Sequence, residues 1–432
     1  MNSPTDLVAA PAFREALKFW SKLGWINFGG PAGQIAIMHR ELVEQRRWVD
    51  EASFLHGLNY CMLLPGPEAM QLATWLGWRL HGLRGGLAAG TLFVLPATLL
   101  LALLSWVYLR FGELPLVAAA LYGIQAAVLA IVIHALLRIG SKVLRTPVSF
   151  ALAGIALLAI GVLHWPFPAV VLGAGALGML LWRIAPRYLA SGELAHAVAS
   201  PHETSRSASL PKALMLATAL LLAWWLPLLA ARVWLGDDST AWAMGLFFSK
   251  AALVTLGGAY AVLPYVAQQA VDVHAWLTPE QMLVGLGLAE STPGPLIIVL
   301  EFVGFVGAWQ NPDLTSPLLS ALVGAAVTAW ATFLPSFLFV LPGAPWIDRL
   351  RAWPALNAAM TAITAVVVGA IANLSLWFGW SLVKEAAPVS VGFVAVVAAV
   401  ALFGLVRWHW NVPWIVLGAA VAGVMASLAG MS

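Results

Sequence analysis

Long runs of apolar residues without charge divide much of this chain into segments of membrane-spanning length. A helix needs roughly 18 predominantly apolar residues to cross a bilayer. Four runs come near or exceed that length, and they are Gly85–Leu109, Leu114–Leu137, Ala213–Ala231 and Pro388–Val406. The pattern predicts an all-α polytopic membrane protein.

The apolar segments are arranged in two halves. Each half is predicted to hold a block of broken helices, about Phe13–Gly82 and Trp242–Gln310, followed by four spans. A polar linker, Ala185–Pro211, and one extra span, Lys212–Leu235, join the halves. We therefore expect residues 1–184 and 236–432 to hold about six membrane segments each, with 185–235 as a connecting region. The spans are expected near Gly85–Leu109, Leu114–Leu137, Pro147–Leu163, Pro166–Ile184, Leu314–Leu341, Pro354–Phe378, Pro388–Val406 and Val412–Gly430.

The two blocks are copies of one sequence. Phe19–Pro67 matches Phe247–Pro295 at a constant offset of 228 residues, with twelve identical pairs. Composition alone would give roughly three or four identities, so the match indicates a duplication. Pro96 aligns with Pro335 at an offset of 239, which predicts an 11-residue insertion near Asn311–Ser320.

The distribution of charge predicts that the two copies have opposite orientations. Basic residues cluster in alternate loops, and the loops between them hold few charges or acids. Because basic loops face the cytoplasm, this alternation predicts a cytoplasmic N-terminus, a periplasmic C-terminus and inverted repeats. The segment His39–Arg47 is basic and fits this topology only if both broken elements of the block are re-entrant; it falls outside if Phe19–Met38 crosses fully. Both alternatives leave the inversion intact. The basic loop residues are Arg138, Lys142, Arg145, Arg183, Arg187, Arg206, Lys212, Arg349, Arg351 and Arg407, and the acids of the intervening loops are Glu113, Asp237, Asp238 and Asp313.

Composition narrows the class further. Only 9% of the residues are charged, against about 25% in soluble domains, and the mean hydropathy is +0.88. The net charge of +3 is spread over loops, which indicates topology and not nucleic-acid binding. The single cysteine, Cys61, excludes an internal disulfide and a cysteine-based metal cluster. Charges such as Arg14 and Lys18 interrupt the first thirty residues, so we expect no cleaved signal peptide.

Each block contains two helix breakers at matched positions. The first is a glycine pair, Gly29-Gly30 (followed by Pro31) or Gly257-Gly258, and the second is a PGP triplet, Pro65-Gly66-Pro67 or Pro293-Gly294-Pro295. Such breaks are tolerated in a membrane only inside protein or beside a water-filled cavity. A helix that restarts there directs free N–H groups and a positive dipole end toward the break, which favours an anion. Kinking and close packing are the alternative role of single breaks, but four matched breaks favour a transport site.

A lysine accompanies each glycine pair. Lys22 and Lys250 lie seven residues before the first glycine and five before a polar residue, Asn27 or Thr255. A lysine in an apolar segment is costly and is by default functional. A cation with an amide or hydroxyl beside helix N-termini suits a tetrahedral oxyanion, so we assign all four residues to substrate binding. The alternative for Lys22 is that it extends to the membrane interface.

The carboxylates of the two blocks differ. Glu68 directly follows the first PGP triplet, Glu290 precedes the second by three residues, and Glu301 lies beyond it. A buried carboxylate can exchange protons near neutral pH, so Glu68 and Glu290 are the candidates for proton coupling. Glu68 has the alternative role of offsetting the helix dipole. Gln71, one turn after Glu68, is a candidate ligand or a packing hydrogen bond.

These motifs resemble the chromate ion transporter family in its long, two-domain form. The resemblance rests on FGGP at Phe28–Pro31, LLPGPEAMQLATWLG at Leu63–Gly77, TLGGAY and STPGP in the second half, and EFVGF at Glu301–Phe305. It implies a bacterial inner-membrane protein with halves of opposite orientation that exports chromate with the proton motive force, and it implies sulfate as a competing analogue. The second half has Leu296 and Val299 where the first has Glu68 and Gln71, so the halves need not share roles.

The resulting prediction is an antiporter that exchanges chromate for protons. Two alternatives that also transport an anion stay open: a proton-coupled transporter of sulfate or another oxyanion, and an anion channel. The protein could also assemble as a homodimer. A membrane-embedded enzyme is the rival class. The sequence has no GxGxxG after a strand, no cysteine pair and no HExxH motif, so we expect no cofactor, no metal site and no enzymatic activity.

Overall fold

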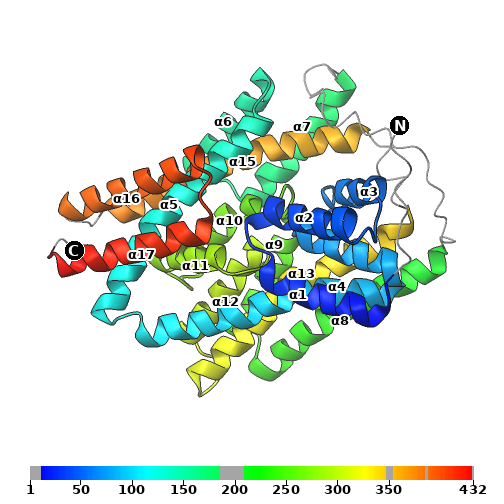
Figure 1. The fold of residues 1–432 in the computed structure, drawn as a ribbon, viewed down its shortest axis with the longest axis horizontal. Coiled ribbons are helices and arrows are strands. Elements are labelled where there is room, and N and C mark those ends of the chain that lie inside the picture. Colours follow the sequence, from blue (N-terminus) through cyan, green and yellow to red (C-terminus); the bar gives the residue numbers. More distant parts are fainter. Residues whose placement is uncertain (1–10, 185–208, 347–353, 385–387, 431–432) are drawn as a thin grey trace.

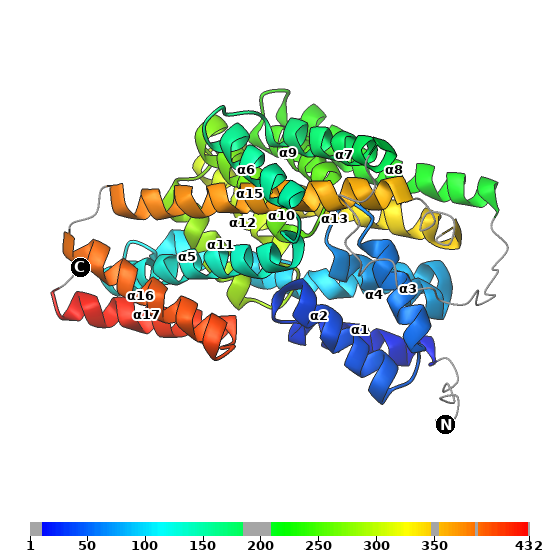
Figure 2. The same ribbon diagram turned by 90° about the horizontal axis from the view of Figure 1, so that it is seen from above.

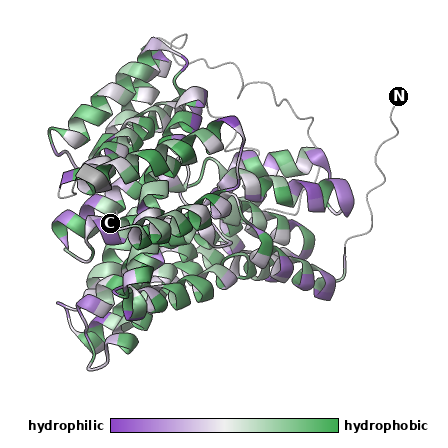
Figure 3. Cartoon of the chain, turned by 60° about the vertical axis from the view of Figure 1, so that its left-hand side comes forward, coloured by the Kyte–Doolittle hydropathy of each residue, from purple (hydrophilic) through white to green (hydrophobic). Residues whose placement is uncertain are grey.

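The protein is a bundle of helices, most of them apolar along their whole length. The computed structural model describes residues 11–184, 209–346, 354–384 and 388–430, and these residues form helices and loops without strands. Seven of the described helices are long and apolar enough to cross a membrane: α4, α5, α7, α8, α13, α15 and α16. Figure 3 shows hydrophobic residues over most of the bundle and hydrophilic ones gathered mainly at helix ends. The fold is therefore that of an all-α polytopic membrane protein, as predicted.

The first half contains a block of short helices followed by long ones. Asn27–Gly29 separates α1 from α2, and a loop containing the PGP triplet separates α3 from α4. The bounds are α1 Phe13–Ile26, α2 Gly30–His39, η1 Arg40–Gln45, α3 Glu51–Cys61, α4 Glu68–Phe111, α5 Pro115–Val143, α6 Pro147–Gly161 and α7 Phe167–Ile184. The connecting helix is α8, Leu210–Leu235. Most of the predicted linker, with Arg187 and Arg206, lies outside the described residues, as do Arg349 and Arg351.

The second half has the same elements in the same order. Even the π-helical turn after α2, η1, has a counterpart, η3, at the matching position. The region of the predicted 11-residue insertion contains a loop at Asn311–Ser316, between α12 and α13, where Asp313 accepts hydrogen bonds from the first amides of α9 at 2.8 Å. The bounds are α9 Thr240–Val254, α10 Ala259–Gln268, η3 Gln269–Val273, α11 Pro279–Ser291, η4 Leu296–Ile298, α12 Val299–Gln310, α13 Pro317–Gly343, η5 Ala344–Trp346, α15 Pro354–Lys384, α16 Pro388–Arg407 and α17 Val412–Leu428.

The chain reverses direction at the glycine pair in each half. In the first half, the Arg46 guanidinium lies 3.9 Å from the Glu15 carboxylate and 5.1 Å from the Phe19 ring, so the segment after α2 has returned to the start of α1. In the second half, the Phe247 ring of α9 packs against His274 and Trp276 in the same way. Each glycine pair is therefore the tip of a helical hairpin.

The PGP triplets also form hairpin tips. The Arg79 guanidinium, near the end of the first part of α4, lies 3.5 Å from the carboxylate of Asp50, which precedes α3. A second reversal follows within α4, where His81 and Gly82 leave helical geometry and Gly77 packs closely against Gly85. The part of α4 from Leu83 onward is therefore the first long helix, equivalent to α13, and no helix of the block before it runs the length of the bundle.

The long helices interlock the two halves. The α5 helix of the first half packs mainly against α16 and α17 of the second, while α15 of the second half packs mainly against α6 and α7 of the first (Figure 2). Small residues permit the close approach of these helices: a Cβ on Gly123 would collide with the carbonyl oxygen of Ala419. In Figure 1, α3 lies toward one end of the long axis and α17 toward the other.

Candidate functional site

The hairpin tips of the two halves meet in two reciprocal junctions. The Gly66 amide of the first PGP triplet donates to the carbonyl oxygen of Thr255, just before the second glycine pair, at 2.8 Å. The Gly294 amide of the second triplet donates to the carbonyl oxygen of Asn27, just before the first glycine pair, at 3.3 Å. Each bond is the other shifted by 228 residues. Every PGP tip therefore touches a glycine-pair tip of the opposite half.

Glycine is required at the centre of each triplet for two reasons. Gly66 has φ +124° and Gly294 φ +123°, a conformation that side chains rarely adopt. There is also little space: a Cβ on Gly66 would lie 2.7 Å from Gln71 Nε2 and 2.9 Å from Ser336 Oγ, and one on Gly294 would collide with Ala97 Cβ. The flanking prolines lack N–H donors, which leaves the glycine amide as the donor of each triplet.

The helices that restart at the tips have no side-chain cap. The N-cap residues of α2, α4, α10 and η4 are Gly29, Pro67, Gly258 and Pro295, and none caps through a side chain. Several helices that begin elsewhere are capped, for example α3 by Asp50 and α11 by Thr278 at matching positions. Uncapped N-termini keep their first N–H groups free for an anion. The helices that follow the tips thus begin without a side-chain cap, and anion binding there stays a prediction.

Buried amide side chains surround the junctions on the side of the first half. Gln34 of α2 donates from Nε2 to the carbonyl oxygens of Asn27 and Gly294 and so ties the glycine-pair tip to the opposite PGP tip. Gln71 donates to the Pro65 carbonyl oxygen at 2.7 Å, within its own tip. The amide oxygens of Asn27, Gln34 and Gln71 are buried without a hydrogen-bond partner among the described residues. Unpartnered buried polar atoms of this kind call for a functional explanation.

The other predicted polar residues lie at different distances from the junctions. A Cβ added to Gly258 would lie 3.4 Å from Glu68 Oε1, so Glu68 sits beside the second glycine pair. Glu290 accepts a hydrogen bond from the hydroxyl of Tyr260, on the helix that starts at that pair. The Thr255 hydroxyl is buried and donates to the Ala251 carbonyl oxygen at 2.7 Å. Both proton-coupling candidates thus face the second glycine pair or the helix that follows it.

The two lysines are not at the junctions. The side chains of Lys22 and Lys250 are exposed on α1 and α9, whereas Asn27 and Thr255, five residues on, are fully buried. The outer glycine of each pair, Gly29 or Gly257, is also exposed. Each lysine therefore lies on the exposed surface of the helix that leads to an accessible glycine-pair tip.

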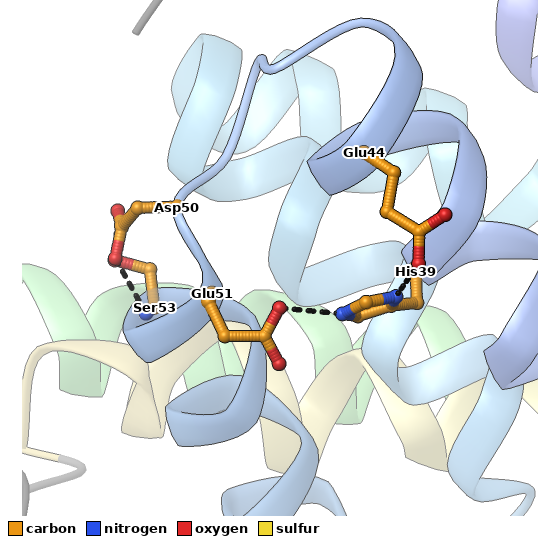
Figure 4. A network of polar contacts seen from close by, with 5 residues as sticks. All are labelled: His39, Glu44, Asp50, Glu51 and Ser53. Atoms are coloured by element: carbon orange, nitrogen blue, oxygen red, sulfur yellow. Dashed lines mark hydrogen bonds and ion pairs between the residues drawn. The ribbon is translucent and has the colours of Figure 1, made fainter. Parts of the chain in front are cut away.

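Charged residues gather where the first-half hairpins begin and end. His39 lies between the carboxylates of Glu44 and Glu51, at 3.1 and 2.6 Å (Figure 4). In the same view, Asp50 accepts hydrogen bonds from the Ser53 amide and hydroxyl. Burial raises the pKa of Asp50, but the Ser53 hydrogen bonds and the Arg79 charge outweigh it and hold the pKa below its usual value. This region anchors the hairpins at the end away from their tips.

Several residues near the tips were missed by the sequence analysis. Gln34, Tyr260 and Ser336 all contact a tip or a residue assigned to it. Alignment of the repeats could have singled out Gln34 and Ser336, because the equivalent positions are Val262 and Ala97. Within the described part of the chain, no group of three or more His, Cys, Asp or Glu side chains is placed to hold a metal ion.

Comparison with known proteins gives matches over nearly the whole chain. The family model "Chromate transporter" matches twice, at residues 14–179 and 242–424. The chain is 30% identical to a chromate transport protein of Cupriavidus metallidurans, over 99% of this chain and 98% of that protein. It is 31% identical to a chromate transport protein of Pseudomonas aeruginosa, over 98% and 94%, and 28% identical to a probable one of Synechococcus elongatus, over 98% of each.

No solved structure matches this chain. The two matches of the family model fall on the two halves, and each contains a glycine-pair tip and a PGP tip. This protein therefore belongs to the chromate transporter family.

Proposed function

We propose that this protein is a secondary transporter that exports chromate from the cytoplasm in exchange for protons and thereby confers chromate resistance. The observation that carries the proposal is the pair of reciprocal junctions, at which uncapped helix N-termini meet from both halves. The relatives named as chromate transport proteins supply the cargo. Chromate suits the site because a tetrahedral dianion can accept several backbone N–H groups at once.

The two halves are proposed to be inverted repeats in a bacterial inner membrane. The hairpins of each half meet the other half tip to tip, which is the contact expected of re-entrant hairpins that enter a membrane from opposite faces. Residues 1–184 and 236–432 would be the repeats, and 185–235 the connection between them. This arrangement has a cytoplasmic N-terminus and a periplasmic C-terminus, and it keeps the basic segment His39–Arg47 on the cytoplasmic side.

Substrate binding is assigned to the tips and their approaches. Backbone amides at the glycine pairs (Gly29, Gly30, Gly257 and Gly258) would hold the oxyanion, with Asn27, Gln71 and Thr255 beside them. The PGP triplets would line the site and aim the helices that follow them, because the Gly66 and Gly294 amides already bond across the junctions. The exposed ammonium groups of Lys22 and Lys250 would attract the dianion toward the tips, one from each membrane face. Glu68 and Glu290 remain the candidates for proton coupling, because both lie close to the second glycine pair or its helix.

Two other functions share this geometry. Sulfate has the shape and charge of chromate and would fit the same donors, so a proton-coupled sulfate or oxyanion transporter is the second candidate. An anion channel would use the same donors but would move no protons. A homodimer is an assembly compatible with either.

The decisive experiment is chromate uptake by proteoliposomes that contain the pure protein, with and without an imposed pH gradient and with sulfate as competitor. Chromate accumulation that requires the gradient is the expected result, and Lys22→Ala with Lys250→Ala should slow it strongly, most at low ionic strength, because exposed charges act at long range only when salt is low. Potential-driven flux without proton movement would identify a channel. Unchanged flux in the double variant would remove the lysines from the mechanism.

A further inference from the structure

A row of buried polar side chains in α12 and α13 makes no hydrogen bond. Thr328, Thr332 and Ser336 are spaced four residues apart along one stripe of α13, and Glu301 lies on the facing helix α12. All four are at most 2% exposed. Neither Glu301 carboxyl oxygen and none of the three hydroxyls has a hydrogen-bond partner among the described residues.

Three buried hydroxyls elsewhere in this bundle do have a hydrogen-bond partner, although that of Ser249 has none in the described part of the chain. Thr74, Ser105 and Thr255 each donate to the carbonyl oxygen four residues earlier, at 2.7 to 2.9 Å. A buried polar group without a partner costs about 1–3 kcal/mol. Four such groups in one seam of the core oppose stability, so they call for a role other than packing.

The row leads from Glu301 to the first PGP tip. The α12 and α13 helices are antiparallel, with Gly304 packed against Gly324 and Thr328. Glu301 is one turn before Gly304 on the same side of α12, which places it beside the turn from Thr328 to Thr332. At the other end, Ser336 Oγ would lie 2.9 Å from a Cβ on Gly66.

Glu301 has no counter-charge in this seam. No described residue forms an ion pair with it, and α13 and η4 carry no titratable side chain. An ionised carboxylate buried in the core without a counter-charge costs several kcal/mol, so we expect Glu301 to carry a proton in this conformation. The titratable residues of the other helices packed against α12 are Glu68, Arg79, His81, Arg84, Tyr108 and Arg110 on α4, Lys250 on α9, and Glu280 and Glu290 on α11.

The first half has no equivalent row. The positions that match Glu301, Thr328, Thr332 and Ser336 are Ala73, Ala89, Phe93 and Ala97, all fully buried. Because both halves build the same hairpins and long helices, the scaffold does not need polar groups at these positions. The row is therefore an addition to the second half alone.

We propose that Glu301 is a proton-binding site and that the hydroxyls of Thr328, Thr332 and Ser336 hold water molecules that relay its proton to the tip at Gly66. Side chains four residues apart on a helix lie about 5–6 Å from one another, so each proton transfer passes through a water molecule hydrogen-bonded between two of these groups. The Glu301 carboxyl gives its proton to such a water as that water passes one of its own protons along the row, so one proton moves and Glu301 becomes a carboxylate. Rebinding of a proton returns it to the neutral acid. The coupling role of this site rests on the proposed function, whereas proton binding by Glu301 does not.

Infrared difference spectroscopy of the purified protein during a pH titration tests the binding site without any transport. The wild type should show the carbonyl stretch of a buried protonated carboxyl, and Glu301→Gln should lose that signal while keeping the melting temperature of a folded protein. A spectrum of Glu301→Gln identical to that of the wild type would overturn the assignment. Glu301→Asp, which keeps the carboxyl, should restore a shifted band and covers the case in which Glu301→Gln fails to fold.

Proteoliposomes then test the relay. Glu301→Gln should retain chromate–chromate exchange but lose accumulation driven by a pH gradient, and Thr332→Val should slow the proton flux read by an internal pH dye. Thr98→Val is the matched control, because the Thr98 hydroxyl already bonds to the Val94 carbonyl oxygen. Gradient-driven accumulation by Glu301→Gln at the wild-type rate would overturn the relay. Absence of chromate movement in the wild type would instead refute the proposed function, and the infrared result would stand.

Discussion

The two halves of this protein share a scaffold but place their polar groups in different parts of it. In the first half, buried polar side chains sit at the hairpin tips, as Gln34 and Gln71 do, where the second half has Val262 and Val299. In the second half they sit in the seam between α12 and α13, where the first half is apolar. The difference shows that duplication produced the same hairpin tips in both halves. Different residues at matched buried positions then give the first half the amide side chains that contact the tips and the second half the proposed proton site.

The largest expected effect on transport and stability comes from replacing the central glycine of a PGP triplet by alanine, which adds a methyl group at the tip. Gly294→Ala should abolish transport and lower the melting temperature more than Gly66→Ala does. Both substitutions carry the strain of a positive φ, about 1–3 kcal/mol, but Ala97 Cβ cannot move away from a new methyl, whereas the ends of Gln71 and Ser336 can rotate. Transport assays and thermal melting in detergent measure the two effects.

A control separates strain from collision at these tips. Gly236→Ala has the same kind of strain, with φ +98°, but opens onto free space, so it should be the mildest of the three variants. Adding Ala97→Gly to Gly294→Ala should restore part of the lost stability. If Gly66→Ala lowers transport and the melting temperature more than Gly294→Ala does, the collision with Ala97 is not the dominant effect at the second PGP tip.

A smaller effect is expected when a first-half tip is made like its second-half counterpart. Gln34→Val removes the donor to the Asn27 and Gly294 carbonyl oxygens and should cost about 1–3 kcal/mol, since the Gly294 carbonyl oxygen loses this donor and the Asn27 carbonyl oxygen keeps only the Gly294 amide. The KM for chromate should rise because Gln34 no longer holds the first glycine-pair tip against the second PGP tip. Gln125→Val is the matched control: Gln125 also joins the halves, by a bond to the Glu280 carbonyl oxygen, but far from the tips in sequence.

Gln125→Val should therefore lower stability with little change in KM. Equal changes in KM for the two variants would mean that Gln34 acts only through general stability. A Gln34→Val variant with a normal KM and a normal melting temperature would show that the Gln34 hydrogen bonds between the tips are not needed for transport.

The smallest effect concerns the matched caps of α3 and α11. Thr278→Ala should cost about 1 kcal/mol of stability. Asp50→Asn keeps a side chain that can cap the helix and should lose only the contribution of the Asp50 charge, which is present at neutral pH. The pKa of Asp50 is lowered in the folded protein, so the stability from its charge is present above the unfolded pKa of about 3.9 and is lost as the pH falls through the folded pKa. The deficit of Asp50→Asn should shrink below about pH 4, whereas that of Thr278→Ala should not.

Melting curves of both cap variants over a range of pH check this difference. A deficit of Asp50→Asn that stays constant down to low pH would show that the Asp50 charge, with its Arg79 partner, adds nothing to the cap. The hydroxyl of Thr278 does not titrate, so any pH dependence of its variant reports on other groups.

Much of the fold could be read from the sequence because its signals are local. The charge-free runs marked long helices, and the glycine pairs and PGP triplets marked the four hairpin tips, but not the reversal at His81 and Gly82. The offset change from 228 to 239 predicted an insertion near Asn311–Ser320, and a loop at Asn311–Ser316 lies in that region. The candidate site was less accessible: Asn27, Thr255 and Glu68 lie at the junctions or next to them, but Lys22 and Lys250 are exposed on the approaches.

The sequence by itself indicated a duplicated membrane protein with four helix breaks at matched positions, since hydropathy, helix breaking and repetition are read directly along the chain. Only the tertiary structure decided which tips meet, that the hairpins turn back on themselves, and that α5 and α15 pack against the opposite half. It alone brought Ser336 close to Gly66 and showed that Glu301 has no hydrogen-bond partner among the described residues. Those features depend on contacts between residues far apart in sequence, where close packing at small residues, and not local propensity, selects the neighbour.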